Sequence, residues 1–331
     1  MGTYKEIRGT HIVSVTSDPP SPVNGQMWYN STDKVVKGFT SNSAGAWASG
    51  GALGTGRERG AGNGTQTSAL AYGGLTAPGS PNKTGKTESY NGTAFSEVND
   101  LNTTRYDISG GAGTDSTQAL CIGGQTGAGR QVITEQWNGS SWTEVGDLNV
   151  SKGAGQGTGT YTSAIATGGD TAPTADAETW NGSSWTEVSN MNRSRVTAGM
   201  SGTSNTAALA FGGLDPSPAA IHGETESWNG SAWTELNDLN QARDSLSGSG
   251  TYTSAIAAGG DNPHSTALSV TESWNGTSWT EVADLSTARS RPLNNAGLDA
   301  TQALVSGGES FITTTEELNL PATSTVTFTV S

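Results

Sequence analysis

The chain has 331 residues and a formal net charge of −14, which argues against binding to a phosphate backbone, because that would need clustered lysine and arginine. Only 32% of the residues are hydrophobic and 47 are glycine, so few windows can form an amphipathic helix and we expect an all-β fold. The single cysteine, Cys121, excludes a disulfide framework. No apolar stretch approaches the roughly 18 residues of a membrane span, so we expect no membrane insertion, and the polar first ten residues carry no secretory address.

The N-terminal residues predict an extension that precedes the repeated part of the chain. Residues 3–17 are typical of a strand, and the proline-rich residues 18–22 are typical of a stiff spacer. We therefore divide the chain into an N-terminal extension, residues 1–39, and a repeat domain, residues 40–331. The alternative is that residues 25–39 form an extra hairpin covering an edge of that domain.

A ten-residue pattern recurs five times. Each copy begins with glutamate, has an aromatic residue two positions later, continues with Asn-Gly, and ends with a second aromatic residue, a hydroxyl residue and glutamate. A fixed internal period is typical of repeat architectures, because each unit buries its apolar face only against its neighbours. The copies are Glu88–Glu97, Glu135–Glu144, Glu178–Glu187, Glu226–Glu235 and Glu272–Glu281.

Two further marks recur in register with this pattern and indicate six units. A Gly-Gly pair closes each short apolar run, and the second aromatic residue returns every 43 to 48 residues, a period that fits a four-stranded propeller blade. The second aromatic residues are Trp47, Phe95, Trp142, Trp185, Trp233 and Trp279. The Gly-Gly pairs are Gly73-Gly74, Gly123-Gly124, Gly168-Gly169, Gly212-Gly213, Gly259-Gly260 and Gly307-Gly308.

The unit around Cys121 illustrates the four strands that we expect in each repeat. Asn138-Gly139 joins its last two strands, because Asn-Gly accepts the positive φ angles of a tight hairpin at little cost. The expected strands are Tyr106–Gly111, Gln118–Ile122, Val132–Trp137 and Ser141–Val145.

The glutamate of each third strand has two interpretations. Six carboxylates suggest a ring for metal or acid–base chemistry, whereas one basic residue at a constant offset in each unit suggests a charge-assisted hydrogen bond. We favour the second, structural interpretation because it accounts for both charges. The glutamates are Glu88, Glu135, Glu178, Glu226, Glu272 and Glu316, and the basic residues are Arg57, Arg105, Lys152, Arg195, Arg243 and Arg289. The aromatic residues Trp137, Trp180, Trp228 and Trp274 belong to the same structural repeat.

This arrangement resembles the kelch family of β-propellers, whose blades carry a Gly-Gly pair on the second strand, an aromatic residue on the third and a tryptophan on the fourth. The resemblance covers roughly residues 40 to 320, although the usual tyrosine of the third strand is tryptophan in most copies here. It implies a six-bladed β-propeller. It implies no particular activity, because propellers of this family serve as binding scaffolds and as enzymes.

The two ends of the repeat region complete each other. Trp47 has the motif of a fourth strand with no Gly-Gly pair before it, whereas the last unit has Gly307-Gly308 and residues 316–319 with no tryptophan after them. We therefore expect the Trp47 strand to enter the sheet of the last unit and close the propeller. The alternating tail, residues 323–331, predicts a further strand, either beside that closing sheet or on the N-terminal segment.

The loops between the second and third strands vary in length, whereas the basic residue always follows the second aromatic residue by ten positions. In an antiparallel blade these variable loops all lie at one end, and variable loops on a rigid scaffold commonly form a binding surface. The alternative is that their charged residues are ordinary solvated groups. The candidate binding residues in these loops are Lys83, Lys86, Arg130, His222 and His264.

Enzymatic interpretations find little support in the sequence. The three histidines, His11, His222 and His264, lie far apart, and Cys121 belongs to an apolar strand, so the copper site of a kelch-type oxidase is not indicated. The Ser-x-Asp-x-Gly-x-x-Trp boxes of sialidases and the Gly-x-Ser-x-Gly elbow are absent from the sequence. We predict a protein that is not an enzyme and needs no cofactor or metal.

Residues 22–39 resemble a segment near the start of virion proteins of tailed phages, particularly marine ones, including some that continue into kelch-like repeats. The resemblance implies a virion protein, either a tail fibre or adhesin or a capsid-associated protein, that binds other virion proteins through residues 1–39. Its propeller would bind a host-surface glycan or receptor. Whether the protein forms a homo-oligomer on the particle is left open by the sequence. The alternatives are a free-standing bacterial kelch binding module and, with least support, a glycan-active enzyme.

Overall fold

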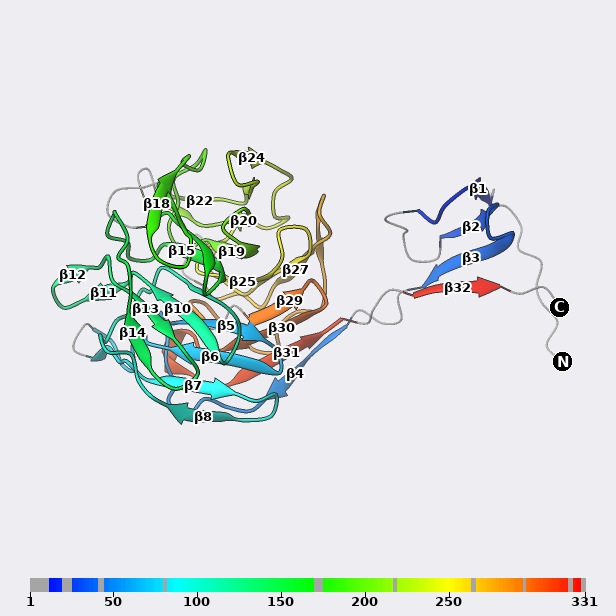
Figure 1. The fold of residues 1–331 in the computed structure, drawn as a ribbon. Coiled ribbons are helices and arrows are strands. Elements are labelled where there is room, and N and C mark those ends of the chain that lie inside the picture. Colours follow the sequence, from blue (N-terminus) through cyan, green and yellow to red (C-terminus); the bar gives the residue numbers. More distant parts are fainter. Residues whose placement is uncertain are drawn as a thin grey trace. The chain divides into compact units, whose positions relative to one another are not determined.

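The computed structural model describes residues 12–19, 26–40, 45–79, 82–169, 175–216, 219–262, 266–293, 296–320 and 324–328. The regular structure of these residues is β-strands, with 3-10 turns such as Glu309–Phe311 and no α-helix, so the predicted all-β fold is confirmed (Figure 1). The chain divides into two compact units. Unit 1 combines Met1–Ala44 with Leu320–Ser331, and unit 2 is Gly45–Asn319. The C-terminal tail therefore belongs with the N-terminal residues, whereas the sequence had placed it in the repeat domain.

Unit 1 contains a four-stranded sheet built from both ends of the chain. Its order is β1 (Val13–Val15), β2 (Met27–Asn30), β3 (Val35–Thr40) and β32 (Ser324–Phe328), with β1 parallel to β2 and the other pairs antiparallel. Of the two partners left open for the tail, the structure selects the N-terminal segment. The strands β2 and β3 do form a hairpin, and they pair within unit 1 rather than with a sheet of unit 2.

Asp18 connects three strand residues of unit 1. Its carboxylate accepts hydrogen bonds from Trp28 Nε1 at 3.0 Å, Asn30 Nδ2 at 2.8 Å and Lys37 Nζ at 2.8 Å. These bonds, that of Lys37 above all, lower the pKa of Asp18 to about 2. The proline-rich residues 18–22, predicted as a spacer, lie between β1 and β2 in the sequence and so belong to unit 1.

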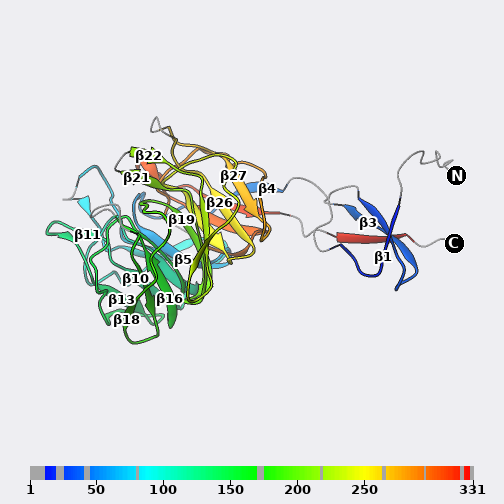
Figure 2. The ribbon, with the colours of Figure 1, turned by 90° about the horizontal axis from the view of Figure 1, so that it is seen from above.

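Unit 2 contains six four-stranded antiparallel sheets, one for each predicted repeat (Figures 1 and 2). The first three sheets are β5 (Ala61–Thr65), β6 (Ser68–Tyr72), β7 (Thr87–Tyr90) and β8 (Phe95–Val98); β9 (Gly111–Asp115), β10 (Gln118–Ile122), β13 (Thr134–Trp137) and β14 (Trp142–Glu144); and β15 (Gln156–Thr160), β16 (Ser163–Thr167), β17 (Ala177–Trp180) and β18 (Trp185–Val188). The next two are β19 (Gly199–Ser204), β20 (Ala207–Phe211), β23 (Thr225–Trp228) and β24 (Trp233–Glu235); and β25 (Ser247–Gly250), β26 (Ala255–Ala258), β27 (Thr271–Trp274) and β28 (Trp279–Glu281).

The sixth sheet joins two segments that are distant in the sequence. It consists of β29 (Ala296–Asp299), β30 (Gln302–Ser306), β31 (Thr315–Asn319) and β4 (Ala46–Gly50), and Trp47 lies opposite Leu318. The predicted entry of the Trp47 strand into the last sheet is confirmed. Two short ribbons lie in the loops between second and third strands, β11 (Gln125–Thr126) with β12 (Gly129–Arg130), and β21 (Leu214–Pro216) with β22 (Ala219–Ile221).

Two local predictions for the second sheet need correction. The first strand was expected at Tyr106–Gly111, but β9 begins at Gly111, because Asp107 has a φ of 45° and interrupts extended backbone. In the Asn138-Gly139 turn only Gly139 has a positive φ, of 92°. Asn138 contributes its side chain instead, since its Oδ1 accepts hydrogen bonds from the backbone N–H groups of Ser140 and Ser141, both at 2.9 Å.

Five of the six fourth strands carry a tryptophan that connects its sheet to the sheet before it. In four cases the indole N–H donates to a buried threonine at the start of the preceding third strand, and where that position is Ala177 the bond of Trp233 goes to the Ser189 carbonyl at 3.1 Å. Such bonds satisfy a buried indole donor while its ring fills the space between sheets. The four pairs are Trp142–Thr87, Trp185–Thr134, Trp279–Thr225 and Trp47–Thr271, with N–O distances of 3.0 to 3.1 Å.

Candidate functional site

Each third-strand glutamate is buried beside the basic residue of its own repeat, as predicted. In Glu135 both carboxylate oxygens accept hydrogen bonds. Its Oε1 accepts from Arg105 Nη2 at 2.8 Å and from the Thr103 N–H at 3.2 Å, and its Oε2 accepts from the Asn102 N–H at 2.8 Å. The other pairs are Arg57–Glu88 at 2.9 Å, Arg195–Glu226 at 2.6 Å, Arg289–Glu316 at 2.7 Å, Lys152–Glu178 at 3.8 Å, and Arg243–Glu272.

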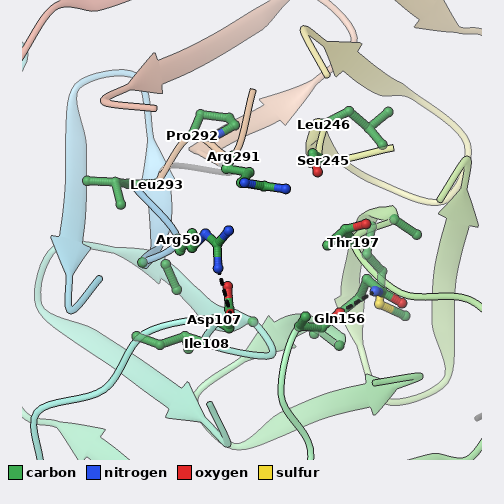
Figure 3. A pocket seen from close by; sticks show the side chains of 18 residues that line it. Arg59, Asp107, Ile108, Gln156, Thr197, Ser245, Leu246, Arg291, Pro292 and Leu293 are labelled. Atoms are coloured by element: carbon green, nitrogen blue, oxygen red, sulfur yellow. Dashed lines mark hydrogen bonds and ion pairs between the residues drawn. The ribbon is translucent and has the colours of Figure 1, made fainter. Parts of the chain in front are cut away.

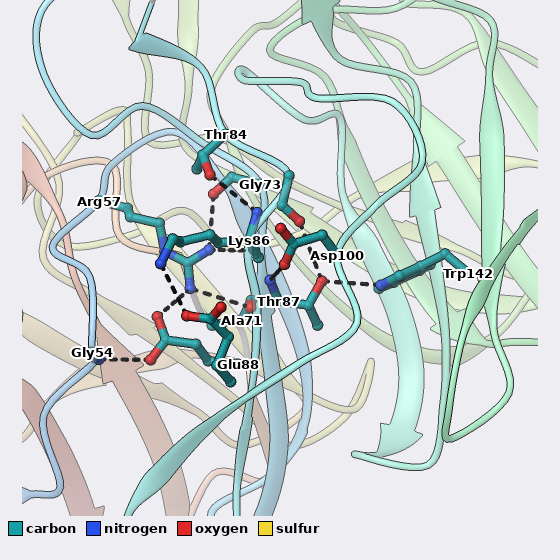
Figure 4. A network of polar contacts seen from close by, with 12 residues as sticks. Gly54, Arg57, Ala71, Gly73, Thr84, Lys86, Thr87, Glu88, Asp100 and Trp142 are labelled. Carbon is teal, nitrogen blue, oxygen red and sulfur yellow. Dashed lines mark hydrogen bonds and ion pairs between the residues drawn. The ribbon is translucent and has the colours of Figure 1, made fainter.

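These ion pairs hold the chain connection in place rather than forming a reactive centre. In the first repeat of unit 2, Arg57 also donates to the carbonyl groups of Gly73 and Lys86, and the Gly54 N–H donates to Glu88 Oε2 at 2.6 Å (Figure 4). Burial lowers the pKa of Arg57. Among the described residues, no three His, Cys, Asp or Glu side chains are grouped as metal binding would require.

The candidate residues of the variable loops do not come together. Lys86 Nζ lies 2.9 Å from Glu97 Oε2, Lys83 forms a β-bridge with Leu75, and Arg130 is exposed in β12. His222 Nδ1 lies 3.3 Å from Glu224 Oε2. Since these four belong to three different loops and none lines the pocket described next, the structure gives no support to a shared site. His264 lies outside the described residues.

A pocket that the sequence did not predict lies where the six repeats of unit 2 converge. The residue two positions after each basic residue adopts left-handed backbone, with φ between 45° and 58°, and all six line this central pocket (Figure 3). Left-handed backbone costs a residue with a side chain roughly 1–2 kcal/mol, so its occurrence in every unit has a structural cause. We call these residues the belt: Arg59, Asp107, Ala154, Thr197, Ser245 and Arg291.

That cause is a series of backbone hydrogen bonds between successive belt residues. The N–H of Ala154 donates to the Asp107 carbonyl at 2.8 Å, and each later member donates to the member before it, up to Arg291, which donates to Ser245 at 2.8 Å. The Arg59 N–H in turn donates to the Arg291 carbonyl at 3.3 Å. Between Arg59 and Asp107 the link is made by side chains, with Nη1 of the arginine 3.4 Å from Oδ2 of the aspartate.

The belt gives the central pocket a mixed polar lining. The hydroxyl groups of Thr197 and Ser245 donate to Asp244 Oδ2 at 3.0 and 3.1 Å. Arg59 and Arg291 point into the pocket (Figure 3), and within the described part of the chain no ion pair or side-chain hydrogen bond occupies the guanidinium of Arg291. Apolar side chains complete the wall of this cavity of about 100 Å³: Ile108, Met200, Leu246, Pro292 and Leu293.

A second depression, the aromatic depression, shares Arg59 with the central pocket. It has a volume of about 410 Å³ and includes Tyr106 and Phe311. The consecutive residues Ser310 and Phe311 have φ values of 66° and 57°, a conformation that is strained for a bulky side chain. The remaining lining residues are Glu58, Leu75, Pro78, Gly79 and Glu309.

Three carboxylates around the two depressions are desolvated by burial. Burial raises the pKa values of Glu58, Asp244 and Asp261, while the charge of Arg291 acts on all three in the opposite direction. Asp244 and Asp261 also bond to each other through their backbones, at 2.7 and 3.1 Å. The site therefore concentrates more negative than positive charge.

Sequence variation alone does not locate the central pocket. Two positions after the basic residue the six repeats carry Arg, Asp, Ala, Thr, Ser and Arg, but one position after it they vary equally, with Glu, Tyr, Gly, Val, Asp and Ser. No family model matches the chain, and no curated protein is significantly similar to it. Among the described residues, no helix has the length and apolar character that a membrane crossing requires.

Proposed function

We propose that unit 2 is a six-bladed, kelch-like β-propeller. Its six sheets each have four strands, and their first strands contact one another in the cyclic order β5, β9, β15, β19, β25, β29 and again β5. The hydrogen bonds of the belt follow the same order. An experimental structure with a seventh sheet, or with β29 separated from β5, would contradict this proposal.

The propeller is a binding module rather than an enzyme. The observation that carries this function is the central pocket, where the equivalent position of the six repeats holds five kinds of side chain while the repeated carboxylates are occupied by buried pairs. Diversity at equivalent positions around a shared cavity is suited to recognition of one ligand, since the scaffold stays constant while the contacts change.

The binding module belongs to a phage virion, and unit 1 attaches it to the particle. Two observations support this attachment: residues 22–39 resemble virion segments, and unit 1 exposes the apolar side chains of Ile12, Val13 and Tyr29, with exposed fractions of 45%, 57% and 36%. Exposed apolar groups on one small sheet suit contact with another protein. The propeller then remains available for a host-surface glycan or receptor.

The attachment is tested with tagged protein added to particles that lack it. Because unit 1 needs β32 as well as β1 to β3, the truncated variant must remove both ends and retain residues 45–319. We expect the full chain to sediment with particles and the truncated chain to stay behind, with unchanged far-ultraviolet circular dichroism of its sheets.

Point variants give a second measurement that does not depend on truncation. Tyr29→Ser should reduce co-sedimentation by tenfold or more, whereas Tyr252→Ser, at a tyrosine of unit 2 with an exposed fraction of 44%, should have no effect. Equal sedimentation of all variants would show that unit 1 is not the attachment element. Absence of the full chain from particles would favour a free-standing bacterial binding module.

A further inference from the structure

We infer that the central pocket and the aromatic depression form a single site for a neutral oligosaccharide, with Arg59 at their junction. This inference rests on the proposed binding function and names its ligand class. Arg59 lines both depressions. Volumes of about 100 Å³ and 410 Å³ place the pair in the range of roughly 300–1,000 Å³ that is usual for small-ligand sites.

Neighbouring residues of two chain segments divide between the depressions. Glu58 and Tyr106 line the aromatic depression, while the residues that follow them, Arg59 and Asp107, line the central pocket, with Arg59 also reaching the first. The Arg59–Asp107 contact of 3.4 Å therefore stands on the boundary. A ligand that extends across this boundary meets both members of the pair.

The polar groups match sugar hydroxyls, which both donate and accept hydrogen bonds. Arg59 and Arg291 supply donors, and Asp107 supplies acceptors. The hydroxyl groups of Thr197 and Ser245, whose hydrogens are donated to Asp244, supply further acceptors. Tyr106 and Phe311 supply aromatic faces for the apolar C–H surfaces of a sugar ring. Both rings are only partly buried, so they keep surface available for a ligand.

Charge selects neutral over acidic sugars. Two arginines face the site, against five carboxylates that line it or interact electrostatically with its residues: Glu58, Asp107, Asp244, Asp261 and Glu309. Burial already raises the pKa values of Glu58, Asp244 and Asp261, so another anion in the same low-dielectric region would be repelled. Uronates, sialic acids and phosphorylated sugars are therefore disfavoured.

The conformation of the Phe311 turn also points to a binding role. Phe311 and Ser310 hold left-handed backbone, and the Phe311 carbonyl lies so close to Gly56 that a Cβ there would approach it to 1.8 Å. Strain of this kind is often found at sites that position a group for a ligand. Here it brings the aromatic ring to the edge of the depression that contains Arg59.

The test measures binding of the full chain to immobilised neutral hexose oligosaccharides and to uronate oligosaccharides of equal length. We expect binding to at least one neutral series and at least tenfold weaker binding to the uronates. Phe311→Gly is the decisive variant, because glycine accepts the backbone conformation without strain and the protein should fold while losing tenfold or more in affinity. Tyr252→Gly, at an exposed position outside the site, is the control.

Charge variants test the selectivity separately. Glu58→Gln with Glu309→Gln should raise uronate affinity at least threefold relative to the affinity for the neutral series, because two carboxylates that line the site lose their charge. Preference for uronates, no binding to any neutral series, or unchanged binding by Phe311→Gly would each overturn the inference. Particle attachment through unit 1 is measured without sugar, so the virion proposal can fail while neutral-sugar binding holds, and the reverse is also observable.

Discussion

The hydroxyl group of Tyr90 in β7 donates a hydrogen bond to the carboxylate of Glu317 in β31, and so connects the first sheet of unit 2 to the last. Burial, followed by this bond, raises the pKa of Tyr90 to about 12. The Gly51 N–H donates to the same hydroxyl at 3.3 Å, and Gln66 Nε2 donates to the Leu318 carbonyl at 3.0 Å. This contact between the first and sixth sheets is called the seam. Its Gln66 bond has a counterpart between the fourth and third sheets, where Asn205 Nδ2 donates to the Trp180 carbonyl at 2.9 Å.

Replacing the hydroxyl group should weaken the seam. We expect Tyr90→Phe to lower the free energy of unfolding by about 1–2 kcal/mol, because a bond to a charged acceptor is lost and the Gly51 N–H loses its partner. Chemical denaturation measures the change. Tyr252→Phe, which removes an exposed hydroxyl group, is the control, and an equal effect of both variants would mean that the bond contributes nothing at the seam.

The seam also lacks the tryptophan-to-threonine bond that is present at four of the other five sheet contacts. Phe95 occupies the position of the fourth-strand tryptophan, and Thr315 Oγ1, at the place of the usual acceptor, is buried without a hydrogen-bond partner among the described residues. Phe95→Trp should supply the missing donor and raise the free energy of unfolding by about 1 kcal/mol. The gain should disappear when Thr315→Val is also present, as a double-mutant cycle would detect.

The two threonine positions should respond differently to the same substitution. Thr134→Val removes the acceptor of Trp185 Nε1, 3.0 Å away, and should cost about 1–3 kcal/mol because a buried indole donor is left unpaired. Thr315→Val removes a hydroxyl group that is already unpaired, so it should be neutral or stabilising. Similar losses for both variants would contradict the proposed origin of the unpaired hydroxyl.

Lys152 is the weak member of the six ion pairs. Its Nζ is buried without a hydrogen-bond partner among the described residues and lies 3.8 Å from Glu178, and burial lowers its pKa. The planar guanidinium of arginine has enough donors for the carboxylate and nearby carbonyl groups. We expect Lys152→Arg to raise the free energy of unfolding by about 1 kcal/mol, and Arg195→Lys, the reciprocal change, to lower it.

Unit 1 should lose order at low pH through Asp18. A carboxyl group whose folded pKa is lowered, here from 3.8 to about 2, stabilises fully above its unfolded pKa and loses that contribution as the pH falls through its folded pKa. The indole N–H resonance of Trp28, which donates to Asp18, should therefore shift between about pH 4 and pH 2. Asp18→Asn should remove this transition, and its persistence would assign the acid response to another group.

Repetition made much of unit 2 predictable. The constant offset between Arg105 and Glu135 indicated a buried pair, and the incomplete motifs around Trp47 and Leu318 indicated that their strands belong together. Both inferences depend only on counting equivalent positions, because each repeat samples the same local structure and reveals what the others have in common. The all-β character followed from composition in the same direct way.

Tertiary structure decided the features that depend on several segments meeting. The alternation of residues 324–328 specifies a strand but no partner, since period-two patterning is the same beside β3 or beside β4. Asp107 acquires its left-handed backbone through the hydrogen bond that its carbonyl accepts from the Ala154 N–H of the next repeat. The meeting of Arg59 with Asp107 and Phe311 likewise depends on how the first, second and sixth sheets converge, which no spacing within one repeat encodes.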